Sequence, residues 1–358
     1  MKRAKGGRGS SGDKPDDTSI ATILLVVALP EERGYFHRAL TERPKWDPTS
    51  ERRNYLCAYD SPFGKVRVVI QTLDGMGQVE SVLGTTSAIV SFTPTLVLMV
   101  GISGSLHSTV GLGDVVVSNQ VKLYAGDKVM SLAATGGKPA KYRLCDSTQT
   151  RPPGANGQIL VDQRDKLFDN SFLRYARHFI ESLPTDEILA GVEPALRSVR
   201  LQQLKTTSLP AAFQELPSTK RSRKLHMGWV LGTHHVVDSE EYKKYLQEKN
   251  TQLQFDVHRQ KGEQDRVPWK NGELLAVDME SYGLVRSVEL LRTTPAPQGG
   301  CPSLIGGIVV RGISDLCAGK GDLDDETGSE IRRLAIENAT NVCLTLIENL
   351  DYPKILNF

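Results

Sequence analysis

The 358-residue sequence has few cysteines, no long apolar run and almost no net charge. Its five cysteines are scattered and form neither a CxxC pair nor a Cys/His cluster, so no disulfide framework or zinc site is predicted. No apolar run approaches the length of a membrane span, and a net charge of +2 implies no strong field for nucleic acids or membranes. We therefore expect a reduced, cytoplasmic protein with no nucleic-acid or membrane partner.

The N-terminus also lacks an apolar segment. It begins with charged residues and no apolar run follows them, so a secretory signal is not predicted and residues 1–19 are expected to be a disordered tail. The apolar fraction of 39% and the charged fraction of 24% are typical of a globular protein. We predict a single domain over residues 20–350, with a variable insertion around 122–223 where the periodic signal is weak.

The sequence does contain short, continuous apolar runs that end at glycines or carboxylates. Such runs are typical of strands buried on both faces of a sheet. Several continue into apolar residues at helical spacing, which predicts an α/β fold, and residues 55–72 predict an antiparallel hairpin. The predicted strands are Ile20–Ala28, Tyr55–Tyr59, Val66–Thr72, Thr95–Val100, Val115–Ser118, Leu225–Leu231, Leu274–Val277 and Leu304–Val310.

Three carboxylates, Glu32, Glu280 and Asp315, lie at the carboxyl ends of separate predicted strands. In open α/β sheets, ligands bind outside the carboxyl ends of the strands, where a carboxylate can accept hydrogen bonds from ligand hydroxyls. For Glu32 and Glu280 the alternative is a carboxylate in the first turn of a helix that satisfies backbone donors. We prefer that alternative for Glu31.

A histidine pair, His234 and His235, follows the predicted strand at residues 225–231. Adjacent residues on a strand point to opposite faces, and no HExxH or HxH pattern accompanies the pair, so no metal site is predicted. We prefer one imidazole that faces the crevice and stacks on a ligand ring.

Five motifs in order resemble the nucleoside phosphorylase/nucleosidase superfamily, particularly methylthioadenosine/adenosylhomocysteine nucleosidases and related purine nucleosidase domains. The resemblance covers most of residues 20–349 and is weak across 122–223. It implies a three-layer αβα fold with a central twisted mixed sheet, and a homo-oligomer. The motifs are ALPEE (28–32), GMGQV (75–79), GISGSL…GLGDVVVS (101–118), VDMES (277–281) and VVRGISD (309–315).

The resemblance implies that the N-ribosidic bond of a purine is cleaved through an oxocarbenium-like sugar, without a metal or organic cofactor. Asp315 matches the family's general acid near purine N7, which must be protonated or share a proton. Glu280 matches the carboxylate that holds the ribose hydroxyls. Glu32 matches the acidic residue that positions or deprotonates the attacking water, a division of labour parallel to that of glycosidases.

Further residues match positions around the substrate. The resemblance places Met279 against the sugar, Ser314 beside Asp315 to orient it, and Arg311 near the attacking group. His235 and Val236 match positions beside the base. Glycine-bearing strand ends let a backbone approach a ligand, and the remaining predicted binding residues are Gly77, Ser103 and Gly104.

The nature of the nucleophile can be predicted from the same motifs. A phosphate dianion requires cationic and hydroxyl donors. The phosphorylases that this chain resembles have an arginine and a serine around the glycine of the fourth strand, where this chain has Met99 and Ile102. The first loop reads LPEE, and a carboxylate there repels phosphate and suits water. We therefore predict hydrolysis; a phosphate-dependent phosphorylase and a non-catalytic nucleoside-binding regulatory module remain alternatives.

Adenine is the expected base, because an aspartate at position 315 suits a purine that accepts a proton at N7. The 5′ substituent is left open between a nucleoside, a thio-nucleoside, AMP and ATP. Some domains that resemble this one act as defence effectors that degrade nucleotides such as ATP. The candidate 5′-phosphate contacts, each of which is otherwise a solvated surface charge, are Arg33, Lys122, Arg143 and Lys320.

Overall fold

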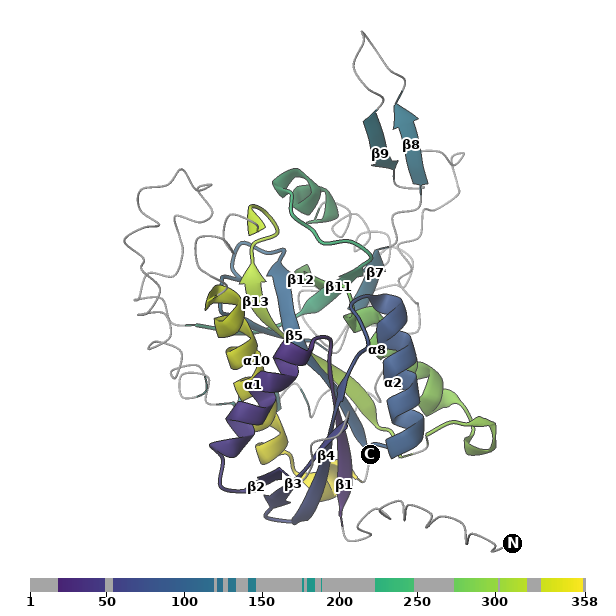
Figure 1. Cartoon of the computed structure of the whole chain (residues 1–358), viewed down its shortest axis with the longest axis vertical. Helices are drawn as coiled ribbons and strands as arrows, with labels where there is room; N and C mark the ends of the chain where they lie inside the picture. Colours follow the sequence, from purple (N-terminus) through teal and green to yellow (C-terminus); the bar gives the residue numbers. More distant parts are fainter. Residues whose placement is uncertain are drawn as a thin grey trace, which may run out of the picture.

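The protein is described from a computed structural model. It describes residues 19–48, 54–118, 121–124, 128–132, 141–145, 176, 179–183, 188, 223–247, 274–301, 303–320 and 330–356. Within these ranges an 11-stranded sheet is covered by helices on both faces (Figure 1). A separate two-stranded sheet is formed by β8 (Lys128–Leu132) and β9 (Lys141–Cys145).

The central strand of the large sheet is β5 (Leu96–Ser105). It pairs in parallel with β1 (Ala21–Val27) on one side and with β13 (Gly306–Asp315) on the other. Its last residues pair antiparallel with β12 (Leu274–Asp278), so the sheet is mixed. The residues of β13 are buried throughout, as expected for a strand covered on both faces.

The remaining strands extend the sheet in both directions. Beyond β1 lie β4 (Gly64–Thr72), β3 (Asn54–Ser61) and β2 (Trp46–Pro48), and the antiparallel pairing of β3 with β4 confirms the predicted hairpin. Beyond β13 lie β6 (Val115–Ser118) and β10 (Leu225–Met227).

A branch of the sheet continues from β12. Strand β11 (Trp229–Thr233) pairs in parallel with β12 and also with β7 (Val121–Tyr124). The last residues of β5 therefore pair with β13 on one side and with β12 on the other, and the sheet branches at this point.

Two apolar cores lie on the two faces of the sheet. Helices α1 (Pro30–Thr41) and α10 (Glu330–Asn349) cover one face, and α2 (Gln78–Phe92) and α8 (Ser281–Thr293) cover the other (Figure 1). Alternate residues of β1 enter opposite cores, which is why its sequence is a continuous apolar run. The shorter helical elements are η2 (Ala296–Gln298), α11 (Tyr352–Ile355) and residues 240–247.

Three strand boundaries predicted from the sequence are wrong. Strands predicted to end at Val100 and Val310 continue, because the β5–β13 ladder extends from these residues to Gly104 and Asp315. The single strand predicted over residues 225–231 is two strands, β10 and β11, which pair with different partners.

Several sequence predictions fall outside the described ranges. These include residues 1–18 of the predicted tail and most of the insertion predicted around 122–223. Among the helices in the described part of the chain, none combines the length and apolar character needed to span a bilayer.

Candidate active site

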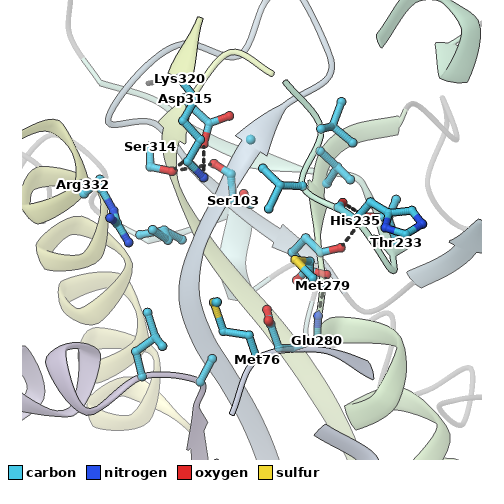
Figure 2. A pocket seen from close by; sticks show the side chains of 18 of the residues that line it. Met76, Ser103, Thr233, His235, Met279, Glu280, Ser314, Asp315, Lys320 and Arg332 are labelled. Atoms are coloured by element: carbon cyan, nitrogen blue, oxygen red, sulfur yellow. Dashed lines mark hydrogen bonds and ion pairs between the residues drawn. The ribbon is translucent and has the colours of Figure 1, made fainter. Parts of the chain in front are cut away.

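A pocket lies where β1, β5, β12 and β13 end. Three carboxylates, from Glu32, Glu280 and Asp315, line it together (Figure 2). Glu32 lies far from Glu280 and Asp315 in the sequence, and the shared sheet edge brings all three into one cavity. The structure thus joins the three predicted catalytic residues in a single site.

The guanidinium of Arg311 links the carboxylates behind the pocket. Its Nη2 lies 2.6 Å from Asp278 Oδ2 and 3.4 Å from Glu280 Oε2, and it also donates to Met99 Sδ at 3.0 Å. Burial opposes the charge of Arg311, but the carboxylates of Asp278, Glu280 and Glu32 raise its pKa. Arg311 is 1% exposed and does not line the pocket, so it acts through these carboxylates.

Glu280 is held by its backbone surroundings at the start of α8. Its Oε1 accepts from the Gly77 amide at 3.2 Å, so Gly77 contacts this carboxylate and does not line the pocket. Burial raises the pKa of Glu280 to about 7; Arg311 opposes this shift, and Asp278 and Glu32 add to it. A carboxylate so placed can accept hydrogen bonds from sugar hydroxyls that enter the pocket.

Asp278 is the important residue that the sequence analysis missed. Its Oδ1 accepts from the Ser281 amide at 3.1 Å, which satisfies a free donor at the start of α8. Asp278 therefore takes the helix-terminal role considered for Glu280, whose side chain makes no cap. The Asp-x-x-Ser spacing before an apolar helical run is the sequence signal that would have indicated this.

Glu32 is both a carboxylate in the first turn of α1 that accepts from backbone amides and a carboxylate that lines the pocket. Its Oε2 accepts from the amides of Ala28 at 2.8 Å and Leu29 at 3.0 Å, while the side chain also lines the pocket. Burial raises the pKa of Glu32, opposed by the nearby Arg311 charge. At Gly101, a Cβ would lie 2.3 Å from Arg311 Nη1 and 2.7 Å from Glu32 Oε1, so only glycine lets both approach β5.

Asp315 lies at the end of β13 among donors. Ser314 Oγ donates to its Oδ2 at 3.0 Å, the Cys317 amide donates to its Oδ1 at 3.0 Å, and Lys320 Nζ lies 3.4 Å from Oδ2. At Gly104, a Cβ would lie 2.7 Å from Asp315 Oδ1, so this glycine makes room for the carboxylate.

The other predicted binding residues divide into two groups. Gly77 and Arg311 lie behind the cavity, as described above. Those that line it are Ser103, Gly104, His235, Val236, Met279 and Ser314 (Figure 2). His235 is exposed, and in the part of the chain that the structure describes no cluster of three or more His, Cys, Asp or Glu suitable for a metal ion forms.

Of the four candidate 5′-phosphate contacts, one lines the pocket. Lys320 lines the pocket, and so does Arg332 from the first turn of α10, which the sequence analysis did not single out. Arg33 is not among the lining residues, and Lys122 Nζ packs 3.7 Å from the centre of the Trp229 ring. The side chain of Arg143 lies outside the described residues.

Comparison with known proteins gives a match to the family model of the phosphorylase superfamily over residues 22–348. The chain is 35% identical over 100 residues to a 5′-methylthioadenosine/S-adenosylhomocysteine nucleosidase from Exiguobacterium, a match to 28% of this chain and 40% of that protein. It is 29% identical over 100 residues to the Bacillus licheniformis enzyme of the same name, covering 28% and 41%. The matches thus span about two fifths of these relatives' length.

Solved structures share the fold at low sequence identity. A Streptococcus pneumoniae 5′-methylthioadenosine/S-adenosylhomocysteine nucleosidase with a transition-state inhibitor aligns at a TM-score of 0.50 and 16% identity, over 92% of this chain and all of that one. Futalosine hydrolase of Helicobacter pylori aligns at a TM-score of 0.50 and 14% identity, over 92% and 99%. These comparisons show a nucleoside phosphorylase-like fold with a central mixed sheet.

Proposed function

The chain belongs to the phosphorylase superfamily, and from that premise we propose that it hydrolyses the N-ribosidic bond of a purine nucleoside or nucleotide, with adenine as the leaving base. The observation that carries this proposal is the convergence of Glu32, Glu280 and Asp315 on one pocket. A binding module needs no carboxylates at both the sugar and the base ends of its ligand, so this arrangement favours catalysis.

In the proposed reaction, the bond between purine N9 and C1′ breaks and its electron pair leaves with the base. Protonation at N7 on the Asp315 side of the pocket neutralises the base. Glu280 accepts hydrogen bonds from the ribose hydroxyls. Water bonds to C1′ and gives its proton to Glu32, whose raised pKa makes it a stronger base than an ordinary glutamate.

The charges near the nucleophile favour water over phosphate. Glu32 and Glu280 present carboxylates there, and Ile102 offers no donor from its side chain. Arg311, the nearby cation, is engaged by Asp278 and Glu280. A phosphate dianion would therefore approach two carboxylates without the cationic clamp it needs, which supports hydrolysis over phosphorolysis.

The 5′ substituent of the substrate is the finer question. Arg332 lines the pocket and provides a cation that suits a 5′-phosphate, so AMP and ATP are substrates to test beside adenosine and methylthioadenosine. Turnover of ATP would suit a nucleotide-degrading defence effector. We further expect a cytoplasmic homo-oligomer that uses no metal or organic cofactor.

The proposal is tested by incubating the purified protein with adenosine, methylthioadenosine, AMP and ATP in phosphate-free buffer and separating the products by chromatography. Free adenine is expected, and Asp315→Asn is expected to lower its release by roughly 10²-fold or more. The matched control is Asp60→Asn, which changes an exposed aspartate of β3. Absence of adenine from every substrate would contradict the proposal, as would an unchanged rate in Asp315→Asn.

A further inference from the structure

The first residues of α2 contact the start of α8, where Glu280 lies. Helices α2 and α8 pack against each other on one face of the sheet (Figure 1). The Gly77 amide donates to Glu280 Oε1 at 3.2 Å, and Gln78 Oε1 accepts from the Gly283 amide at 2.8 Å. One contact therefore reaches the proposed ribose carboxylate, and the other reaches the backbone just after it.

Gln78 satisfies an amide that a helix ordinarily satisfies with its own cap. Glu280 is the N-cap residue of α8, and Gly283 is the third residue of the helix. The side chain of an N-cap residue ordinarily accepts from the amide of the second or third helical residue. Glu280 makes no such cap, and Gln78 from α2 accepts from the Gly283 amide instead. The Glu280 carboxylate is thus left to line the pocket.

The side-chain amide of Gln78 is bonded at both of its atoms. While Oε1 accepts from Gly283, Nε2 donates to the carbonyl of Thr233, the last residue of β11, at 3.3 Å. Because Gly283 offers a donor and Thr233 an acceptor, the amide fits in only one of its two orientations. Gln78 is 6% exposed, so water does not readily replace either contact.

Glycines on three elements leave the space that this arrangement needs. At Gly232 of β11, a Cβ would lie 2.9 Å from Gln78 Nε2, and at Gly283 of α8 it would lie 2.5 Å from the Gln78 carbonyl oxygen. Gly77, just before α2, has a φ of 110°, a conformation that favours glycine. These glycines allow Gln78 to lie between β11 and α8, although Gln78 does not itself line the pocket.

We propose that Gln78 is a positioning residue, which keeps the Glu280 carboxylate available to ribose by accepting from the Gly283 amide in its place. This inference rests on the proposed nucleosidase function, in which Glu280 accepts hydrogen bonds from the ribose hydroxyls. It assigns a part in sugar recognition to a residue that touches no substrate.

The physical reason is a competition for the Glu280 carboxylate. Without the acceptor of Gln78, the buried Gly283 amide would lose its partner, which is costly for a buried donor. A carboxylate is stabilised at a helix N-terminus by the free amides and the helix dipole. Glu280 would therefore turn to cap its own helix, and the ribose hydroxyls would lose their acceptor.

The test compares Gln78→Met with the wild-type protein on two substrates. One is the best substrate from the product assay, and the other is its 2′-deoxy or 3′-deoxy counterpart, whichever the wild type cleaves less well. The ratio of the two kcat/KM values is expected to fall by roughly 10-fold or more in Gln78→Met, the usual size for a hydrogen bond between a hydroxyl and a charged group. Partial unfolding lowers both rates equally and leaves this ratio unchanged.

Two further variants complete the experiment. Glu280→Gln should lower the same ratio, and the double variant Gln78→Met/Glu280→Gln should lower it no further, because both changes remove one interaction. The control is Gln71→Met, which changes a partly buried glutamine of β4 whose amide bonds within its own strand and which should keep the wild-type ratio.

An unchanged ratio in Gln78→Met would overturn the inference and leave Gln78 with a structural role only. Multiplying effects in the double variant would overturn it as well, because Gln78 and Glu280 would then act independently. Failure of the wild-type protein to release any base would instead reject the proposed function itself.

Discussion

At the residue scale, the site depends on one buried arginine that serves several carboxylates. Arg311 is 1% exposed and contacts Asp278 and Glu280, while the charge of Glu32 acts on it as well. Buried charges persist only when they are paired, so these four groups require one another. The network that shapes the acidic side of the pocket is therefore also a determinant of stability.

We predict that Arg311→Met destabilises the protein by about 3–5 kcal/mol, because it leaves buried carboxylates without their counter-charge. Arg38→Met is the matched control: the Arg38 side chain is 62% exposed and pairs loosely with Glu337 at 3.8 Å. Its loss should cost less than about 1 kcal/mol. Urea unfolding measures both variants, and similar free-energy changes for the two would contradict the role given to Arg311.

A second prediction concerns Glu280 and pH. Its pKa is about 7 in the folded protein, raised from 4.5 chiefly by burial, so between these values the folded state holds a proton that the unfolded state has released. This group's contribution to stability is therefore present at low pH and is lost as pH rises from about 4.5 towards 7. The same ionisation supplies the charged acceptor for ribose, so activity should rise over this range.

Glu280→Gln removes this titration. The unfolding free energy of the wild type minus that of Glu280→Gln should fall steadily as pH increases from about 4.5 to 7. The variant should also lose base release at every pH, because the charged acceptor is gone. Glu31→Gln, at an exposed position outside the pocket, is the control for base release and should leave it unchanged. A pH-independent difference for Glu280→Gln would contradict the prediction.

The sequence was sufficient to place the three carboxylates in the site, but not to identify the residues that contact them. Glu32, Glu280 and Asp315 are recognisable because each follows an apolar run and belongs to a motif. From the sequence, Asp278 is only the residue after a predicted strand, and Lys320 is a candidate 5′-phosphate contact or a solvated surface charge. Their roles depend on contacts with Arg311 and Asp315, which arise only when separate strands pair.

At the element scale, glycines within β5 and β13 leave space for the side chains of the site and for the backbone of a packed helix. The predicted strands end before Gly101, Gly104 and Gly312, whereas the structure places these glycines inside paired strands. At Gly312, a Cβ would lie 1.9 Å from the Ala335 carbonyl oxygen of α10, so this glycine lets the helix pack closely on the strand. Periodicity could not reveal this, because the neighbour is a helix from another part of the chain.

Two glycine substitutions should therefore have opposite effects. Gly312→Ala should destabilise the protein by more than about 1 kcal/mol, since a rigid backbone atom must move. Gly34→Ala lies inside α1, where a new Cβ meets nothing within 4 Å, and should stabilise the protein by about 0.5–1 kcal/mol. Thermal unfolding measures both, and shifts of the same sign would contradict the packing described for α10.

At the scale of the whole molecule, the apolar pattern was sufficient to predict an α/β fold, and the order of motifs added the mixed sheet. Continuous apolar runs such as β1 correctly predicted strands buried on both faces, because the two faces of such a strand pack in different cores. The division of residues 225–231 into two strands was not predictable, because both are short and their separate partners are distant in sequence.

The homo-oligomer expected from the resemblance can be tested at α2. This helix exposes apolar side chains at Val79, Leu83 and Val90, which are 66%, 60% and 55% exposed. Such side chains on one helix suit an interface between copies. We predict that light scattering gives a multiple of the single-chain mass and that Leu83→Glu lowers it.

Phe63→Glu, in the β3–β4 turn, is the control for this experiment, because Phe63 is 50% exposed but lies on a different element. It should leave the mass unchanged. A wild-type protein with the mass of one chain, or an unchanged mass in Leu83→Glu, would reject α2 as the interface.

The central claim is that water, not phosphate, attacks the sugar. It is tested most directly by identifying the sugar product when the wild-type protein cleaves its best substrate in phosphate buffer, with ³¹P NMR and chromatography. The carboxylates at Glu32 and Glu280, with Arg311 already engaged, predict the free sugar at a rate independent of phosphate. A sugar 1-phosphate whose formation requires phosphate would contradict the account.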